Sequence, residues 1–240
     1  FFQRTYKTEG LTNLLGTIER RLKGQGGAPV IQLQTPFGGG KTHSLIALYH
    51  IATKQKVNTI VIVGEKLKTG KRASDFETPW GVIEEQLEKK KGEWSSSPIP
   101  PGGEQIRSLL EKHSPVLILM DEMIPYLNDA DAVKVENKTL CSLTLNFLQK
   151  LTNVASSMSD IALILTATPS NPYDRSERGQ EIVSQLQNIS ERRDIIESPV
   201  QDSEITQVIR QRLFTRIDKA KAEAMVSMFL EYATKESILP

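Results

Sequence analysis

The sequence predicts a three-layer α/β fold in which a mainly parallel sheet of five strands lies between helices, followed by a helical segment. Three observations lead to this prediction. Short apolar runs alternate with amphipathic helical patterns over the first 200 residues, which is typical of parallel strands joined by helices. A glycine-rich loop joins one such run to a helix. After residue 200 the pattern contains helices alone.

Composition and charge are those of an ordinary folded protein. The 240 residues are 38% hydrophobic and 25% charged, so neither disorder nor a fibrous structure is expected. Thirty basic and 29 acidic residues leave a net charge of +1, which gives no long-range field for nucleic acid or a membrane. Cys141 is the single cysteine, and no stretch has the roughly 18 to 20 apolar residues of a membrane span. We therefore expect a cytoplasmic protein without a membrane partner.

The first elements follow from the spacing of apolar residues. A helix is expected over residues 11–22, where leucine and isoleucine recur every three or four positions, and glycines at 24–27 end it. Residues 29–33 read as a short buried strand that runs into the glycine loop, and residues 41–54 as the next helix. Residues 58–65 are apolar on both faces, which predicts a second parallel strand covered by helices on both sides.

The middle of the chain continues this alternation. Residues 78–92 predict a helix that begins near a proline and ends in a solvated lysine run. Residues 95–104 are rich in serine, proline and glycine and predict a surface loop, which a short helix over 105–112 follows. Residues 116–120 predict a third buried strand, and residues 128–138 are expected to form a polar loop.

The last elements complete the sheet and add helices. Apolar residues on one face predict a long helix from 140 to 154, and residues 160–171 contain a fourth buried strand. A helix over 181–193 and a short fifth strand within 194–200 follow. Two further helices are expected, over 202–214 and 219–234. The change of pattern predicts two domains, a core over residues 1–200 and a helical segment over 201–240. Because the chain begins at Phe1 rather than Met, we expect further domains of the same polypeptide outside it.

The loop after the first strand has the composition of a phosphate cradle. Nucleotide phosphates are bound by convergent backbone N–H groups, a helix N-terminus and a reachable cation. In QTPFGGGKTH, glycines permit close backbone approach, Lys41 can reach the β- and γ-phosphates, and Thr42 can place its hydroxyl on Mg²⁺. Thr35 replaces the first glycine of G-x-x-x-x-G-K-[ST], and the alternative is a plain glycine-rich turn before a helix. The predicted nucleotide-binding residues are Thr35, Pro36, Phe37, Gly38, Gly39, Gly40, Lys41, Thr42 and His43.

Two carboxylates follow the third strand directly. Asp121 suits a hold on Mg²⁺ together with Thr42, and Glu122 suits a general base that activates the attacking water. The alternative is a strand that ends in a polar loop. The pair follows the glycine loop by about 80 residues, with one strand and helices between, and this combination favours a nucleoside triphosphate and Mg²⁺ as cofactors.

This arrangement resembles the branch of P-loop ATPases in which an extra strand lies between the two phosphate-site strands, and within it the AAA+ ATPases. The resemblance implies a P-loop NTPase core with a helical lid. It further implies that Thr166 or Thr168 senses the γ-phosphate, although either could instead cap a turn. It also assigns an arginine finger, which reaches a neighbouring subunit and so requires self-association, to Arg192 or Arg193. A helix dipole explains arginines at that position equally well.

More narrowly, four segments are similar to a prokaryotic family of large ATPases known as a domain of unknown function, whose genes lie beside DNA methylases and helicases in phage-defence clusters. The segments are FFQRTYKTEGL, FGGGKTHSLIALYH, VLILMDEMIPYL and EITQVIRQRLF. The resemblance implies work in a defence or DNA-processing complex, with DNA contacted through associated subunits.

These observations predict a Mg²⁺-dependent ATPase whose hydrolysis of ATP drives a conformational or remodelling cycle. Two other classes stay open. One is an ATP-binding regulatory switch or scaffold with little turnover. The other is a DNA translocase or helicase, whose later nucleic-acid motifs and second motor domain we do not find in the sequence.

Overall fold

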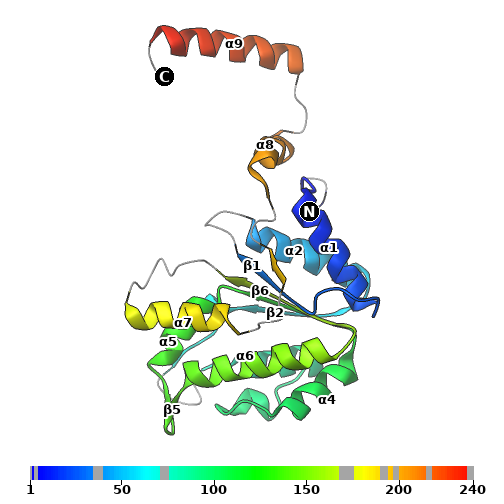
Figure 1. Ribbon diagram of the computed structural model, residues 1–240, viewed down its shortest axis with the longest axis vertical. Coiled ribbons are helices and arrows are strands. Elements are labelled where there is room, and N and C mark those ends of the chain that lie inside the picture. Colours follow the sequence, from blue (N-terminus) through cyan, green and yellow to red (C-terminus); the bar gives the residue numbers. More distant parts are fainter. Residues whose placement is uncertain are drawn as a thin grey trace. The chain divides into compact units, whose positions relative to one another are not determined.

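A five-stranded parallel sheet lies at the centre of the unit Lys7–Gln201 (Figure 1). The computed structural model describes residues 2, 5–34, 40–70, 76–167, 176–189, 194–196, 200–214 and 218–236. The sheet order is β2-β3-β6-β1-β7. Its strands are β1 (Val30–Gln34), β2 (Asn58–Val63), β3 (Val116–Asp121), β6 (Ile161–Ala167) and β7 (Asp194–Ile196). The fold class predicted from the sequence is confirmed, including a strand, β6, between the one that precedes the glycine loop and the one that ends on Asp121.

Helices cover the two faces of the sheet. On one face α1 (Glu9–Leu22) and α2 (Lys41–Lys54) pack over an apolar cluster that includes Leu14, Leu48 and Ile164. A larger apolar cluster lies between the other face of the sheet and a second set of helices. These helices are α3 (Pro79–Glu88), α4 (Gly103–His113), α5 (Met123–Asp131), α6 (Leu140–Ser157) and α7 (Glu177–Gln187), of which α4 and α6 are drawn below the sheet in Figure 1.

The expectation that helices cover the second strand on both faces holds for its contacts with α2 and α3 but not for the burial of all its apolar side chains. β2 is an edge strand, and while Ile60 and Ile62 are buried, Val61 between them is 38% exposed. The side-chain amide of Gln86, on α3, pairs with the open edge: Val61 N donates to Gln86 Oε1 at 2.9 Å and Gln86 Nε2 donates to Val61 O at 2.8 Å. This amide occupies the hydrogen-bonding groups that a further strand would take.

The expected polar loop over residues 128–138 is wrong. Its first residues form the last turn of α5, and the rest include a small antiparallel hairpin of β4 (Lys134–Val135) and β5 (Lys138–Thr139). The helix forms because buried Met123, Tyr126, Leu127 and Ala130 recur at helical spacing. The loop was predicted because the residues of its last turn are mostly polar.

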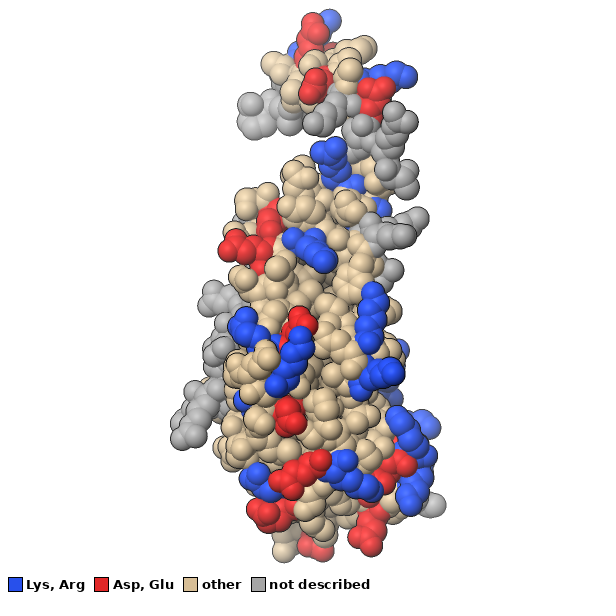
Figure 2. All heavy atoms as spheres, turned by 90° about the vertical axis from the view of Figure 1, so that its right-hand side faces the viewer, with Lys and Arg blue, Asp and Glu red and all other residues tan. Residues whose placement is uncertain are grey.

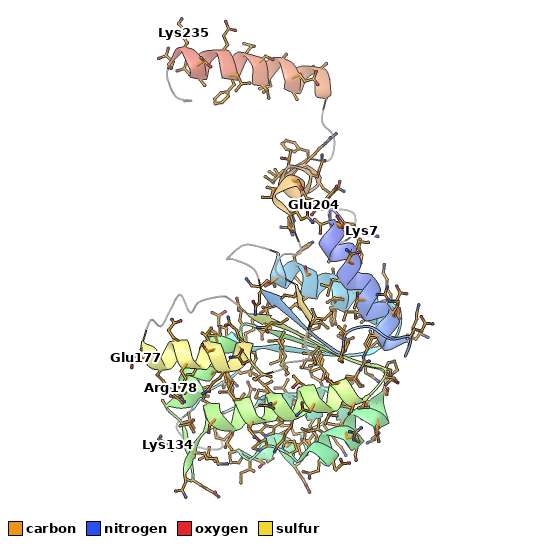
Figure 3. The ribbon with its side chains drawn as sticks, in the orientation of Figure 1. Lys7, Lys134, Glu177, Arg178, Glu204 and Lys235 are labelled. Carbon is orange, nitrogen blue, oxygen red and sulfur yellow. The ribbon has the colours of Figure 1, made fainter. Side chains whose placement is uncertain are left out.

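Helix α5 is tied to α7 at its far end. Arg178, labelled at the start of α7 in Figure 3, donates from Nε and Nη2 to the two carboxylate oxygens of Asp131 at 2.9 and 2.7 Å. Arg178 Nη1 also donates to Glu181 at 2.7 Å. The guanidinium lowers the pKa of Asp131. A two-bonded pair of this kind fixes orientation as well as distance.

Helix α1 is anchored to the sheet by a buried arginine. Arg21 donates from Nε to Ile161 O at 3.0 Å and from Nη2 to Ala155 O at 2.9 Å and to Met158 O. Ala155 and Met158 lie at the end of α6, where carbonyl groups lack partners within the helix. A cation at a helix C-terminus is also favoured by the helix dipole.

The remaining unit comprises Phe1–Tyr6 and Asp202–Pro240. Its described helices are α8 (Ile205–Leu213) and α9 (Lys219–Lys235), and both expose large apolar side chains such as Leu213 and Phe229.

On the face drawn in Figure 2, basic and acidic side chains are interspersed. Within the described residues, no helix is long and apolar enough to cross a membrane.

We expect Arg21→Met to lower the free energy of unfolding by about 3 kcal/mol, because it leaves buried carbonyl groups without donors. Arg20→Met is the matched control, since Arg20 lies on the same helix but is exposed, and it should change stability by less than about 0.5 kcal/mol. Urea denaturation measures both values. Equal effects of the two substitutions would contradict the anchoring role of Arg21.

Gln32, in the middle of β1, generates a second prediction. It is fully buried, and among the described residues neither atom of its amide has a hydrogen-bond partner. Burying an unpaired amide is unfavourable, so Gln32→Met should raise the free energy of unfolding by about 1 to 2 kcal/mol. Thermal denaturation tests this, and a lower melting temperature would show that the amide is satisfied in solution.

Candidate functional site

The candidate site lies where three neighbouring strands end. β6 pairs with β1 and with β3, and the register places Gln34 beside Ala167 and Met120 beside Leu165. The carboxyl ends of these parallel strands therefore lie along one edge of the sheet. Ligands of open α/β sheets bind outside the carboxyl ends of the strands.

The N-terminus of α2 is shaped by a glycine. Gly40 is the N-cap residue with φ 82° and ψ 10°, a left-handed conformation that glycine adopts without steric cost. Its carbonyl accepts from Ser44 N at 2.9 Å and from Ser44 Oγ at 3.0 Å, which closes the first turn. Gly40 carries no side chain that could cap the first N–H groups of the helix. Such groups, with the positive end of the helix dipole, form an anion site.

A buried carboxylate links three elements at this edge. Asp121, at the end of β3, is only 7% exposed. Its Oδ2 accepts from Thr42 Oγ1 at 2.8 Å, and its Oδ1 accepts from Thr166 Oγ1 at 2.6 Å. Residues from α2, β3 and β6 are therefore joined through one side chain.

Glu122 follows Asp121 with an unusual backbone. Its φ of 52° and ψ of 44° are left-handed, and it is the N-cap residue of α5. Its backbone N donates to Thr166 Oγ1 at 3.3 Å. The residue is exposed. Partial burial of the carboxyl raises the pKa of Glu122, and a hydrogen bond with Glu65 and the negative charge of Asp121 raise it further.

Lys41 provides the positive charge at the site. Burial lowers the pKa of its ammonium group, while the charges of Asp121 and Glu122 act in the opposite direction. Two carboxylates are thus electrostatically coupled to one lysine at the start of α2. This arrangement can attract an anion through the lysine and a cation through the carboxylates.

The oxygen donors fit a magnesium–nucleotide complex. Mg²⁺ is held in proteins by one or two carboxylates, waters and substrate phosphates rather than by a full protein cage. Asp121 and the hydroxyl of Thr42 supply such donors. Within the described part of the chain, no cluster of three or more His, Cys, Asp or Glu side chains forms a separate metal site.

Two residues of the site were missed in the sequence reading. Gly64 and Glu65 follow β2, which pairs with β3 so that Val63 lies beside Asp121. A Cβ atom at Gly64 would lie 2.3 Å from Glu122 O and 2.7 Å from the Cα of Met123. The signal was a Gly-Glu pair directly after an apolar strand, and it could be used only once β2 was known to lie beside β3.

The structure brings together Lys41, Thr42, Asp121, Glu122 and Thr166. His43 lies half-buried in the first turn of α2. The other predicted site residues lie outside the described residues, and these are Thr35, Pro36, Phe37, Gly38, Gly39, Thr168, Arg192 and Arg193.

Comparisons with known proteins give a partial family match and several similar folds. A family described as the DUF499 N-terminal domain matches residues 1–75. No curated protein matches the sequence. A DNA replication initiation factor has a TM-score of 0.46 at 17% identity, with 85% of this chain and 51% of that chain covered.

Two further solved structures are similar at the same level. DnaA from Aquifex aeolicus, bound to AMPPCP, has a TM-score of 0.47 at 16% identity, with 90% of this chain and 56% of that chain covered. The ORC2 protein of Aeropyrum pernix, in ADPNP and ADP complexes, has a TM-score of 0.48 at 14% identity, with 84% of this chain and 50% of that chain covered. The chain thus spans about half the length of the solved structures that it matches.

Proposed function

We propose that this chain binds ATP with Mg²⁺ and hydrolyses its β–γ phosphoanhydride bond. One observation carries the proposal: the Asp121 carboxylate accepts hydrogen bonds from Thr42 and Thr166 at the N-terminus of a glycine-capped helix. This unites an anion site, a set of oxygen donors for a divalent cation and an adjacent carboxylate, Glu122. A structural role alone accounts for the buried Asp121 but not for the exposed Glu122 in a left-handed conformation beside it.

Each residue has a distinct part in the proposed reaction. The first N–H groups of α2 and the ammonium of Lys41 bind the phosphate oxygens. The hydroxyl of Thr42 and the carboxylate of Asp121 would hold the metal ion, which would supply positive charge to neutralise the phosphate oxygens. Glu122 orients the attacking water and accepts its proton. The raised pKa of Glu122 makes its carboxylate a better proton acceptor than an ordinary glutamate.

The wider context of the reaction is also a proposal. Arginines at 192 and 193 would reach the nucleotide of a neighbouring copy, so the active form would be an oligomer. Residues 1–200 would form the catalytic core and residues 201–240 the start of a lid. The match of residues 1–75 to the DUF499 N-terminal domain is in keeping with the narrower resemblance of the sequence, and thus with work in a phage-defence or DNA-processing complex.

Glu122→Gln should lower the ATP turnover rate by about 10²- to 10⁴-fold while leaving ATP affinity within about twofold, because it removes a proton acceptor but keeps the shape of the side chain. Phosphate release and binding of a fluorescent ATP analogue measure the two quantities. Glu104→Gln is the matched control, since the Glu104 side chain is 90% exposed on α4, and it should leave turnover unchanged. Wild-type turnover no faster than that of Glu122→Gln would instead favour a nucleotide-dependent switch or scaffold.

Lys41→Met should weaken ATP binding by at least about tenfold, because it removes the cation that faces the phosphates but keeps the length of the side chain. Titration calorimetry with ATP and Mg²⁺ gives the affinity. Lys54→Met, at the last residue of the same helix, is the control and should bind ATP as the wild type does. Unchanged affinity in Lys41→Met would place the phosphate site elsewhere.

A further inference from the structure

The left-handed backbone of Glu122 requires an explanation. A residue with a Cβ atom is disfavoured at φ 52° because Cβ approaches the following carbonyl oxygen. Such a conformation persists only where the surrounding structure enforces it, and it is common at functional sites. Two neighbouring strands contact the backbone of Glu122, one from each side of β3.

The first contact comes from β6. Thr166 is 5% exposed, and its hydroxyl donates to Asp121 Oδ1 at 2.6 Å while accepting from Glu122 N at 3.3 Å. A hydroxyl has one proton to donate. That proton is used on Asp121, so in this arrangement it is not available to an oxygen of the γ-phosphate. The hydroxyl instead joins the side chain of Asp121 to the backbone of Glu122.

The second contact comes from Gly64, which directly follows β2. A Cβ atom at Gly64 would lie 2.3 Å from the carbonyl oxygen of Glu122, 2.9 Å from its carbonyl carbon and 2.7 Å from Met123 Cα. All three are backbone atoms, so they cannot move aside by a side-chain rotation. Only glycine at 64 allows β2 to come this close to the start of α5.

We propose that Thr166 and Gly64 are positioning residues that hold Glu122 in its left-handed conformation from two sides. The role of Glu122 in water activation rests on the proposed function, whereas its backbone geometry does not. Thr166 acts through the Asp121–Glu122 pair and does not read the γ-phosphate. Gly64 acts by permitting contact, and a methyl group there would displace the peptide that joins Glu122 to α5.

The Thr166 role is tested with a pair of substitutions. Thr166→Val keeps the shape and removes the hydroxyl, and we expect kcat to fall by about 10- to 100-fold with KM within about twofold, because the base is misplaced. Thr166→Ser restores the hydroxyl and should recover kcat to within about threefold of the wild type. Thr152→Val controls for the loss of a buried hydroxyl, since Thr152 is 1% exposed and its hydroxyl donates to Gln149 O of its own helix at 2.9 Å, and it should keep kcat.

A γ-phosphate sensor would behave differently. Its loss would lower the ratio of ATP affinity to ADP affinity, whereas we expect Thr166→Val to leave that ratio unchanged, as measured with fluorescent analogues of both nucleotides. A reduced ratio, a kcat equal to that of the wild type, or a failure of Thr166→Ser to recover activity would each overturn the assignment of Thr166.

The Gly64 role is tested with an alanine pair. Gly64→Ala should lower kcat by about 10- to 100-fold with nucleotide affinity retained. Gly103→Ala is the control, because a Cβ atom there meets nothing within 4 Å, and it should keep wild-type kcat. Gly64→Ala with wild-type kcat would overturn the assignment of Gly64. If Gly64→Ala does not fold, as judged by circular dichroism, the Thr166 series decides the proposal.

Crystal structures of Thr166→Val and Gly64→Ala separate this inference from the proposed function. We expect φ of Glu122 to leave the left-handed region in at least one of the two variants. A positive φ in both would overturn the inference even if the wild type is an active ATPase. A wild type that hydrolyses no ATP would defeat the proposed function, while a changed φ in the variants would still support the positioning role.

Discussion

The carboxylate of Asp121 is the interaction on which the rest of the site depends. A buried carboxylate is costly unless both oxygens have partners. Here one oxygen accepts from Thr42 and the other from Thr166, so satisfying the charge also fixes α2 and β6 relative to β3. The sheet order makes this possible, because β6 lies between β1, which leads into the loop before α2, and β3. The strand order therefore determines which residues meet at the site.

The charges at this edge favour a particular ligand. Asp121 and Glu122 carry two negative charges against the one positive charge of Lys41. The charges of Glu65 and Lys66, which also act on Glu122, oppose one another. A polyphosphate alone would bring further negative charge close to two carboxylates. A divalent cation that arrived with the phosphates would lower this repulsion, because it would supply charge of the opposite sign. The site is therefore better suited to a metal–nucleotide complex than to a free anion.

Local patterns in the sequence predicted most of the core and missed what depends on neighbours in space. Apolar runs such as residues 116–120 identified the buried strands, because a strand covered on both faces carries few polar residues. The same rule overstated the burial of β2, which α2 and α3 contact from opposite faces but whose Val61 is apolar yet exposed at the edge. Lys41, Thr42, Asp121 and Glu122 were found because their motifs are local. Gly64 was missed because its contact with Glu122 exists only when β2 pairs with β3.

In the proposed function, the edge strand β2 would therefore support the chemistry of the site as well as the sheet. The amide of Gln86 pairs with Val61 at the outer edge of β2, which stabilises the strand that Gly64 directly follows. At its other end, α5 is held by the paired hydrogen bonds between Arg178 and Asp131. Glu122 lies between these two supports, which add to the proposed hold of Thr166 and Gly64 on its left-handed backbone. If Glu122 is the base of the proposed reaction, restricting the motion of its backbone in this way would keep its carboxylate directed at the bound water.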